Sequence, residues 1–476
     1  MSKELSNFRS FEKIKNLLFI FLGFCIFFVS NTNGMFWDNI LFASKMGNHL
    51  YSNSILDWTI PDQFDPGHPP FLGFLLAISW KILGHKLWVA HLLMVPFTIG
   101  VFYQLFKFIS IFIEDQKNQI LAFLLIIADP TLSTQFVIVN PEVIIVFFFF
   151  LAVNGILFNH KTTKFIGLFF LSIVSFRSMM LFSGLFLFDV FNKHFIEKKK
   201  LKIILNLKFL LFYLLSCLPG FVFVCWRLLT KGWLQTHPDS PWVGLWAFAD
   251  LKTFLKNCFF LVQRYLDFGR VFIFLFIAVS LILFGKKIIA SSKSKQLLLI
   301  ASTSVFFIVV VSLISTNTFG HRYFIVSYIT FTLLAFTILQ HLYKSKKILF
   351  SLLFLGLVSG NIWMYPRKIS QGWDATLAHI PYHSLRIEAI DYLNKEKIDV
   401  DKVAGFFPNL TTLDNIDFRG DQRSFANFNA INKYVFYSNV YNLADSQYEI
   451  LDTNYSILKE FNKNNITVII YILKEK

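Results

Sequence analysis

Charged side chains are scarce in this chain of 476 residues, and acidic side chains are the scarcest of them. Only 16% of the residues are Asp, Glu, Lys or Arg, whereas a typical soluble domain has about a quarter. Hydrophobic residues make up 55%, and 61 residues are Phe. This composition excludes a soluble globular protein. It also excludes intrinsic disorder, which requires low hydrophobicity and few aromatic residues.

A CxxC pair and a small-residue cleavage site after the first apolar run are also lacking. The chain has four cysteines and no CxxC pair, and Cys25, Cys217 and Cys225 lie inside apolar runs. Neither a zinc site nor a disulfide framework is indicated. The apolar run 16–33 follows a basic start, but no small-residue cleavage site comes after it. We therefore expect a retained first membrane helix rather than a signal peptide.

Long apolar runs are abundant, and they predict a membrane protein. A helix that crosses the hydrocarbon core needs about 20 mostly apolar residues. The stretch 164–192 is too long for one span and is interrupted at Ser175, Arg177 and Ser178, which predicts two short helices there. The other qualifying runs are 16–33, 87–110, 118–138, 141–158, 203–226, 268–285, 296–316, 323–341 and 347–365. The sequence thus predicts eleven spans.

The excess of positive charge orients these spans. Lys and Arg number 45 against 29 acidic residues, a formal net charge of +16. With the N-terminus inside, the long basic runs, such as 198–200 and 286–287, all fall in short cytoplasmic loops, as the positive-inside rule requires. The positive charge is therefore read as a topology signal and not as a nucleic-acid-binding surface.

The last part of the chain differs in character. Eleven spans place the C-terminus outside, and from residue 366 the chain is polar and rich in Asn and Asp. A helical pattern at 383–395 and a β-branched run at 466–473 predict a small α/β domain. We expect a membrane domain over 1–365 and a soluble external domain over 366–476.

The first external loop, 34–86, is longer than any other connection between predicted spans. Connections of that length are uncommon unless they are functional. It places Asp38 just beyond the first span and ends in an apolar stretch, 71–83. This stretch is too short to span comfortably, and we expect a helix lying along the outer membrane surface.

These residues resemble a known family. An acidic residue after the first span, followed by Phe-Asp-x-x-His-Pro-Pro-Phe at 64–71, is similar to the C-type fold of integral-membrane glycosyltransferases. The nearest likeness is to the protein O-mannosyltransferase and aminoarabinose transferase superfamily and its bacterial relatives. The pattern continues, over about residues 15–345, with Leu83-Gly84, Ala128-Asp129-Pro130, Asn140-Pro141-Glu142 and Gly320-His321-Arg322-Tyr323.

The resemblance implies transfer of a sugar from a polyprenyl-phosphate donor to a glycolipid, polysaccharide or protein acceptor, with inversion at the anomeric carbon. It implies a bacterial inner-membrane enzyme with its N-terminus in the cytoplasm and its active site outside. Asp38 matches the catalytic acidic position. The expected donor- and acceptor-binding residues are His68, Glu142, Arg177, Arg322 and Tyr323.

The chain departs from the family pattern at two positions. Asn39 follows Asp38 where many relatives have a second acid, and Glu142 stands where Asp is frequent. The sequence does not identify a cofactor, and a divalent cation held by Asp38 and Glu142 stays open as an alternative.

Structural roles compete with each functional one. Asp38 is also typical of a solvated loop acid, Glu142 of a helix first turn, and Arg177 of a side chain that reaches the interface. The loop tryptophans Trp233, Trp242 and Trp246 have two interpretations, a lining for the lipid-donor groove and, more simply, an aromatic belt at the membrane interface. A transporter or flippase, or a polymerase or ligase for lipid-linked saccharides, are the alternative functions. Convergence of the acids and arginines on one outward-facing site would favour the enzyme.

Overall fold

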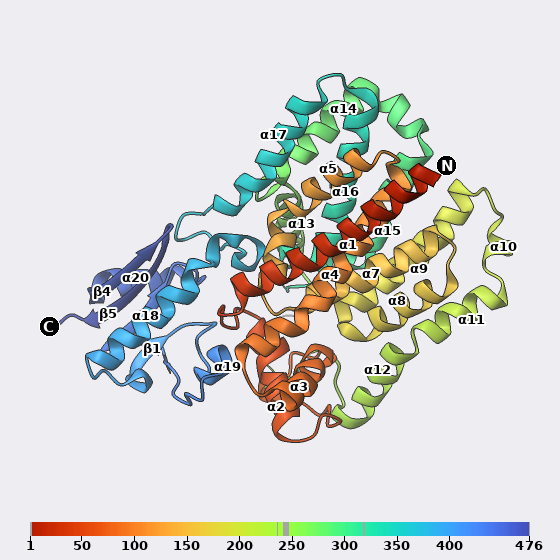
Figure 1. Ribbon diagram of the computed structural model, residues 1–476. Helices are drawn as coiled ribbons and strands as arrows, with labels where there is room; N and C mark the ends of the chain where they lie inside the picture. The colour runs from red at the N-terminus through yellow and green to blue at the C-terminus, as the bar shows by residue number, and fades with distance from the viewer. Residues whose placement is uncertain (1, 236, 241–246, 318, 476) are drawn as a thin grey trace.

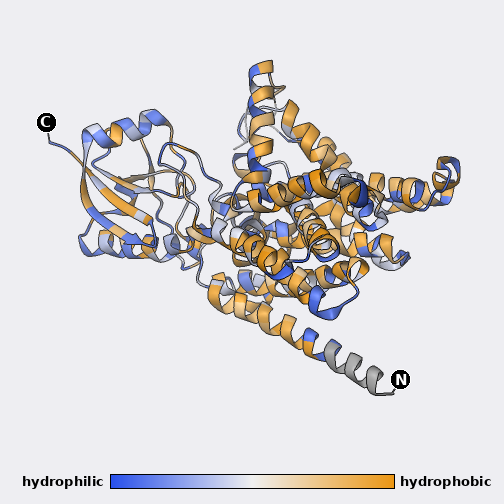
Figure 2. Ribbon diagram, turned by 90° about the horizontal axis from the view of Figure 1, so that it is seen from above, coloured by the Kyte–Doolittle hydropathy of each residue, from blue (hydrophilic) through white to orange (hydrophobic). Residues whose placement is uncertain are grey.

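The computed structural model describes residues 2–475 apart from 236, 241–246 and 318, with side chains from residue 12 onward. A large bundle of helices is followed by a small sheet domain at the C-terminal end (Figure 1). Hydrophobic residues cover most of the helices of the bundle, whereas the C-terminal helices are strongly hydrophilic (Figure 2). Apolar outward faces are stable where lipid is the solvent. The predicted fold class, a mostly helical membrane protein with a small C-terminal α/β domain, is confirmed.

Within the described residues, six helices are long and apolar enough to cross a membrane. They are α1 (Ser2–Ser30), α4 (Leu87–Phe112), α9 (Phe176–Phe191) with its π-helical extension η3 (Asn192–Ile196), α14 (Arg270–Ala290), α15 (Ser292–Ile314) and α16 (Ile325–Leu342) with the preceding 3₁₀ turn η4 (His321–Phe324). Two bent pairs raise the number to eight. They are α5 (Gln116–Ile127) with α6 (Pro130–Val137), bent by 75°, and α11 (Leu207–Ser216) with α12 (Leu218–Lys231), bent by 56°.

Three further helices coincide with the remaining predicted spans but are shorter. They are α7 (Pro141–Leu157), α8 (Lys161–Val174) and α17 (Lys346–Ser359), with 17, 14 and 14 residues. Eight of the eleven expected segments therefore meet the length requirement, and the number eleven stays a prediction. The break expected within 164–192 is confirmed. α8 ends at Val174, and Ser175 caps α9 by accepting a hydrogen bond from the Ser178 N–H.

The loop 34–86, which the sequence predicts to be external, has its own helical structure. It contains the π-helix η1 (Ile40–Lys45), α2 (Met46–Ser52), the 3₁₀ turn η2 (Asp62–Phe64) and α3 (Phe71–Leu83). The helix predicted at 71–83 is confirmed with the same bounds, and its place at the membrane surface stays a prediction. α2 and α3 are in close contact, because a Cβ added to Gly73 would lie 2.9 Å from the Met46 Cβ. Two more helices, α10 (Leu201–Ile204) and α13 (Leu251–Leu266), flank the bundle.

The C-terminal domain is a five-stranded mixed sheet with helices. Its strands lie in the order β2-β1-β3-β5-β4. β1 (Val403–Gly405) pairs in parallel with β2 (Ala426–Asn427) and with β3 (Tyr434–Ser438), and β5 (Ile466–Leu473) is antiparallel to β3 and to β4 (Tyr455–Lys463). The helices are α18 (Pro381–Lys395), α19 (Asp414–Asp417) and α20 (Asp445–Asn454). The expected strand 466–473 and the helix over 383–395 are both confirmed.

The C-terminal domain contacts the loop 34–86 through hydrogen bonds and a contact between aromatic rings. The Met35 N–H donates to the Ile416 carbonyl at 2.9 Å, and Asn48 Nδ2 donates to Asn415 Oδ1 at 2.7 Å. The Phe418 ring lies 4.9 Å from the Trp80 ring, between centroids. Because these contacts flank Asp38 on both sides in the sequence, the loop that carries this acid is held between the bundle and the C-terminal domain. The division at residue 365 is a proposal for where one domain passes into the other.

Candidate active site

Four of the residues singled out by the sequence lie at the beginnings of helical segments. Glu142 is in the first turn of α7, Arg177 in the first turn of α9, and Arg322 in η4, which leads into α16. Asp38 immediately precedes the turn into η1. Pro141 opens α7 at a position where its missing N–H costs nothing. The helix N-termini carry partial positive charge, which favours anions in the space between them.

The Arg322 guanidinium is the centre of the cluster. Its Nη2 pairs with the Asp38 carboxylate, and its Nε lies 3.3 Å from Glu142 Oε1. The same Glu142 oxygen accepts a hydrogen bond from Arg177 Nη1. The Arg322 side chain is only 4% exposed. A planar guanidinium can donate in several fixed directions, which explains how one cation bridges carboxylates from distant segments.

A third carboxylate, which sequence reasoning missed, reaches Arg322 from the other end of the chain. Asp374 Oδ2 pairs with Arg322 Nη1. Asp374 lies in the 3₁₀ turn η6 (Trp373–Ala375), and its carbonyl accepts a hydrogen bond of 2.7 Å from Gln135 Nε2. The Thr131 hydroxyl donates to the next carbonyl, that of Ala375, at 3.2 Å. No local pattern around Asp374 marks it, because only the docking of this turn on α6 brings it to the cluster.

Aromatic and apolar groups close the inner side of the cluster. The Arg177 guanidinium lies 4.2 Å from the centroid of the Tyr323 ring, a cation–π contact. A small cavity of about 20 Å³ is bordered by Glu142, Arg177, Arg322 and Tyr323 and by aliphatic side chains of α7, α9, α15 and α16. This is room for about one water molecule. The buried Glu142 Oε2 has no hydrogen-bond partner among the described residues, so it is free to accept one.

His68 lies at the edge of the cluster, next to α9. Its Nδ1 accepts a hydrogen bond of 3.2 Å from the Phe176 N–H, which places its proton on Nε2. Burial and then the positive charges of Arg177, Arg227 and Arg322 lower the pKa of His68 to about 3. His68 is thus neutral at physiological pH and offers an Nε2–H donor beside the two arginines of the site.

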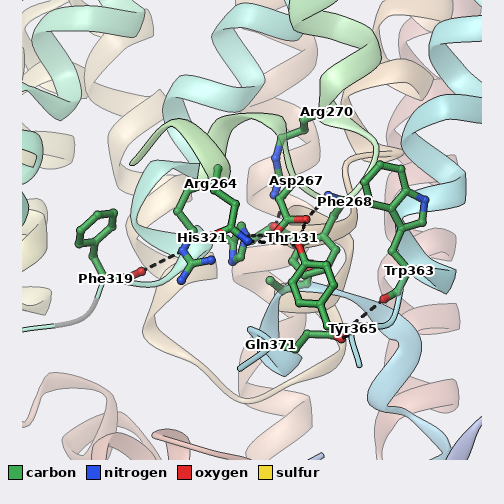
Figure 3. Close-up of polar contacts among 12 residues, drawn as sticks. Thr131, Arg264, Asp267, Phe268, Arg270, Phe319, His321, Trp363, Tyr365 and Gln371 are labelled. Atoms are coloured by element: carbon green, nitrogen blue, oxygen red, sulfur yellow. Dashed lines mark hydrogen bonds and ion pairs between the residues drawn. The ribbon is translucent and has the colours of Figure 1, made fainter. Parts of the chain in front are cut away.

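A second network holds η4, and with it Arg322, in place (Figure 3). His321 Nε2 donates to Asp267 at 2.8 Å, and the Tyr365 hydroxyl donates to the other oxygen of the same carboxylate. Burial acts to raise the pKa of Asp267, but the His321 and Tyr365 hydrogen bonds outweigh it and hold that pKa below its ordinary value. Gly372 is required here, because an added Cβ would lie 2.9 Å from His321 Nδ1.

Two further buried ion pairs lie outside the Arg322 cluster. Arg270 donates to Asp129, the N-cap of α6, at 3.1 Å and to the Thr131 hydroxyl at 3.0 Å. Asp65 and Arg227 form a pair of 2.9 Å in which both side chains are buried. Asp65 is the acid of the 64–71 motif, and its role in this structure is to hold the loop against α12.

Of the three tryptophans expected to form an aromatic belt, the structure describes Trp233. The Trp233 ring lies 4.2 Å from the Arg227 guanidinium and is buried, so Trp233 packs inside the protein and does not belong to a lipid-facing belt. Trp242 and Trp246 lie outside the described residues.

A metal site does not fit the residues present. Among the described residues, no group of three or more His, Cys, Asp or Glu could hold a metal ion. Asp38 and Glu142, the pair considered for a divalent cation, and the neighbouring Asp374 all pair with the Arg322 guanidinium, which supplies the positive charge that such a cation would bring.

Comparison with known proteins supports the fold. No family model matches the sequence, and no curated protein matches it. The chain is similar to two solved structures of ArnT from Cupriavidus metallidurans, one bound to undecaprenyl phosphate and one in the apo state. Each has a TM-score of 0.52 and 10% sequence identity and covers 95% of this chain and 97% of the ArnT chain. The likeness includes the C-terminal domain, which the sequence motifs did not reach. The chain therefore has, over almost its whole length, the fold of ArnT, a C-type integral-membrane glycosyltransferase.

Proposed function

We propose that this protein is a glycosyltransferase that moves a sugar from a polyprenyl-phosphate donor to an acceptor on the external face of the membrane, with inversion. The observation that carries the proposal is the cluster in which Asp38, Glu142 and Asp374 share Arg322, with Arg177 beside it. The ArnT-like fold supports a polyprenyl-phosphate donor, since one of the two ArnT structures was solved bound to undecaprenyl phosphate. The proposed location is a bacterial inner membrane with the N-terminus in the cytoplasm.

The cluster supplies the two functions that inverting transfer needs. Arg322 and Arg177 bind the phosphate of the donor and stabilise the negative charge that it gains as it leaves. Asp38 accepts the proton of the acceptor hydroxyl, so that the new C–O bond forms on the face opposite to the departing phosphate. The products are the glycosylated acceptor, polyprenyl phosphate and a proton on Asp38. Glu142 orients the acceptor through its unpaired Oε2.

His68 and Tyr323 complete the arrangement. The neutral His68 ring donates from Nε2 to a donor oxygen, and its fixed Nδ1 contact with Phe176 sets its direction. Tyr323 shields the Arg177 guanidinium from water on one face. A sugar phosphate is far larger than the cavity of about 20 Å³ beside these groups. Asp374 pairs with Arg322 Nη1, so a donor phosphate that binds Arg322 there displaces this carboxylate.

The experiment that tests the function uses the full chain in nanodiscs. The donors are undecaprenyl phosphates carrying single hexoses or pentoses, the acceptor is a total bacterial envelope lipid and glycan extract, and release of undecaprenyl phosphate is followed by mass spectrometry. Asp38→Asn should lower the rate by about 10²–10⁴-fold, the usual contribution of a positioned base. Asp57→Asn is the matched control, because Asp57 lies in the same loop and pairs locally with Thr59.

Two outcomes would contradict the proposal. If Asp38→Asn transfers sugar at the native rate, Asp38 is not the base. If no donor releases undecaprenyl phosphate with the native protein, the glycosyltransferase assignment itself falls.

The alternatives differ in what the same site would do. A polymerase or ligase would keep the lipid-phosphate donor and transfer a longer saccharide, so a series of donors of increasing length distinguishes it. A transporter or flippase would carry the lipid-linked saccharide across without breaking the phosphate–sugar bond. The convergence of Asp38, Glu142 and Arg322 on one cluster favours the enzyme.

A further inference from the structure

Arg264, in the last turn of α13, is a half-buried arginine without an acidic partner. Its Nε donates to the Phe319 carbonyl at 3.2 Å, and its two Nη groups make no hydrogen bond or ion pair among the described residues (Figure 3). By contrast, each of the five buried arginines that the structure describes pairs with a carboxylate: Arg177, Arg227, Arg270, Arg322 and Arg386. Arg264 therefore keeps donors that can hold an anion.

The charge of Arg264 is only partly compensated. Burial lowers the pKa of Arg264 from its ordinary value, and the negative groups nearby, Asp267 and Asp374 among them, raise it by less than burial lowers it. The Asp267 carboxylate is already occupied, since one of its oxygens accepts from His321 and the other from Tyr365. Of these two acids, Asp374 is the one left to pair with Arg264.

Arg264 and Asp374 contact the same short turn of the chain. Arg264 holds the carbonyl of Phe319, and Asp374 pairs with the Arg322 guanidinium. Three positions separate Phe319 from Arg322, at most about 10 Å of extended chain. The Asp374 carboxylate thus lies close to two guanidiniums and pairs with one of them.

The main chain before Asp374 is tied to the C-terminal domain. Gln371, 3% exposed, donates its N–H to Asn442 Oδ1 at 3.1 Å, and its carbonyl accepts from Asn442 Nδ2 at 3.0 Å. Four residues earlier, the Arg367 guanidinium donates to Asp452 at 2.8 Å. These contacts fix the course of the segment that carries Asp374.

The main chain at Asp374 is tied to α6. Gln135 Nε2 donates to the Asp374 carbonyl at 2.7 Å, and the Thr131 hydroxyl donates to the Ala375 carbonyl at 3.2 Å. Both contacts use main-chain atoms of the segment, so the Asp374 side chain, 16% exposed, can change rotamer while the segment stays in place. A phosphate that binds Arg322 therefore displaces one side chain and leaves the C-terminal domain docked.

A displaced carboxylate is stable near the cluster only beside another cation. Without one, Asp374 would lose a charge-assisted hydrogen bond and gain no replacement. The unpaired Nη groups of Arg264 offer that replacement. We propose that Arg264 is a positioning residue, which accepts the Asp374 carboxylate when the donor phosphate takes its place on Arg322. This role rests on the proposed function, because the donor phosphate is the group that drives the exchange.

The test measures the binding of undecaprenyl phosphate, without sugar transfer. The full chain is placed in phosphatidylcholine nanodiscs, and the Kd is measured by titration. Arg264→Gln should weaken binding by the native chain about fivefold, the value of a partly exposed ion pair. In an Asp374→Asn background, where no carboxylate needs a second cation, the same change should alter the Kd by less than about twofold.

Two further variants and the melting temperature separate positioning from other roles. Arg264→Lys keeps a cation, so its Kd should stay within about twofold of native. Lys252→Gln removes an exposed positive charge from the same helix and should leave the Kd unchanged. The Tm of Arg264→Gln without ligand should stay near the native value, because the guanidinium has no ion pair to lose in the free protein. In a cryo-electron-microscopy structure of the native complex, the Asp374 carboxylate should lie on Arg264.

The outcomes that would overturn the proposal differ from one another. Equal weakening by Arg264→Gln in both backgrounds, with a native Tm, would mean that Arg264 binds the phosphate itself. Equal weakening with a lowered Tm would mean a structural role, and an unchanged Kd would mean no role in binding. If the native protein does not bind undecaprenyl phosphate, the proposed donor is contradicted and this proposal falls with it.

Discussion

The bundle contains two buried charge clusters, one around Asp189 and one around Arg322, and they differ in whether their carboxylate oxygens are all paired. Asp189, on α9, pairs with two cations, Lys193 at 3.0 Å and Lys164, and accepts a hydrogen bond of 2.9 Å from the Tyr213 hydroxyl. Both of its oxygens are used. In the cluster around Arg322 the carboxylates outnumber the guanidiniums by three to two, and Glu142 Oε2 has no partner. Both clusters bury charged groups, so burial of charge alone does not distinguish a ligand-binding site. The distinguishing feature of the Arg322 cluster is an unpaired carboxylate oxygen, Glu142 Oε2, on a residue that borders a cavity.

The difference also predicts what each cluster does. The Asp189 cluster has one carboxylate and two ammonium groups, and both oxygens of that carboxylate already have partners. It ties α8 and α9 together near the predicted cytoplasmic ends. The Arg322 cluster has spare acceptor capacity and a cation shared among competing acids, so a phosphate can replace one of them.

Replacing the central cation should give the largest effect on activity. Arg322→Lys keeps one positive charge but cannot reach three carboxylates and a phosphate in fixed directions. We expect kcat/KM to fall by about 10²–10³-fold, the scale of a lost transition-state donor. Steady-state transfer assays in nanodiscs measure this. Activity within a few-fold of native would show that Arg322 is structural, like Arg270.

The Asp189 cluster should respond in stability instead. Asp189→Asn leaves Lys164 and Lys193 without their carboxylate, and breaking a buried ion pair in this way costs about 3 kcal/mol. The Tm should fall by several degrees, while transfer per folded molecule at a low temperature stays native. A loss of turnover in the folded fraction would contradict the contrast between the two clusters.

The pH dependence of the free energy of unfolding tests whether His68 is neutral in the folded protein. Because the pKa of His68 is lowered to about 3, its contribution to stability is complete above its unfolded pKa near 6.5. That contribution is lost as the pH falls from there toward 3. His68→Gln removes one titrating group, so its stability should fall less steeply below pH 6.5, by up to about 1.4 kcal/mol per pH unit. Tm values of the native protein and of His68→Gln, measured over the same series of pH values, test this. Parallel plots of Tm against pH would mean that His68 takes up its proton over the same pH range in the folded and the unfolded protein.

The smallest effect is expected at Asp374. Asp374→Asn removes one negative charge next to Arg322, so the donor phosphate no longer competes with a carboxylate for the Arg322 guanidinium. We expect binding of undecaprenyl phosphate to tighten about fivefold, since a partly exposed charge is screened by solvent. Titration of the nanodisc-embedded protein measures the Kd. Weaker binding would show that Asp374 orients Arg322 and does not compete for it.

Much of the fold could be predicted because membrane helices and caps are local signals. The break at Ser175 was visible as an interruption by polar residues, and the structure shows the capping box that such residues form. The strand 466–473 was visible as a β-branched run. The short helix α8 agrees with the two short helices predicted within 164–192, whereas α17 ends at Ser359, before the expected end at 365, because apolar composition continues past the end of the hydrogen-bonded helix.

The candidate site could be predicted only in part. Short motifs single out Asp38, Glu142, Arg177, Arg322 and Tyr323, and the structure brings these five side chains together, while their roles in a reaction stay a prediction. Trp233 was wrongly placed in an interfacial belt, because its contact with Arg227 depends on how the loop folds back on α12.

The sequence by itself determined that the chain is a membrane protein, and it predicted the direction in which the spans run and which few acids and arginines lie on the outer side. These follow from composition, run length and charge order, which act locally along the chain. Only the tertiary structure decided that Asp374 joins Asp38 at Arg322. Such contacts join segments hundreds of residues apart, and the packing of whole elements sets them without any local pattern.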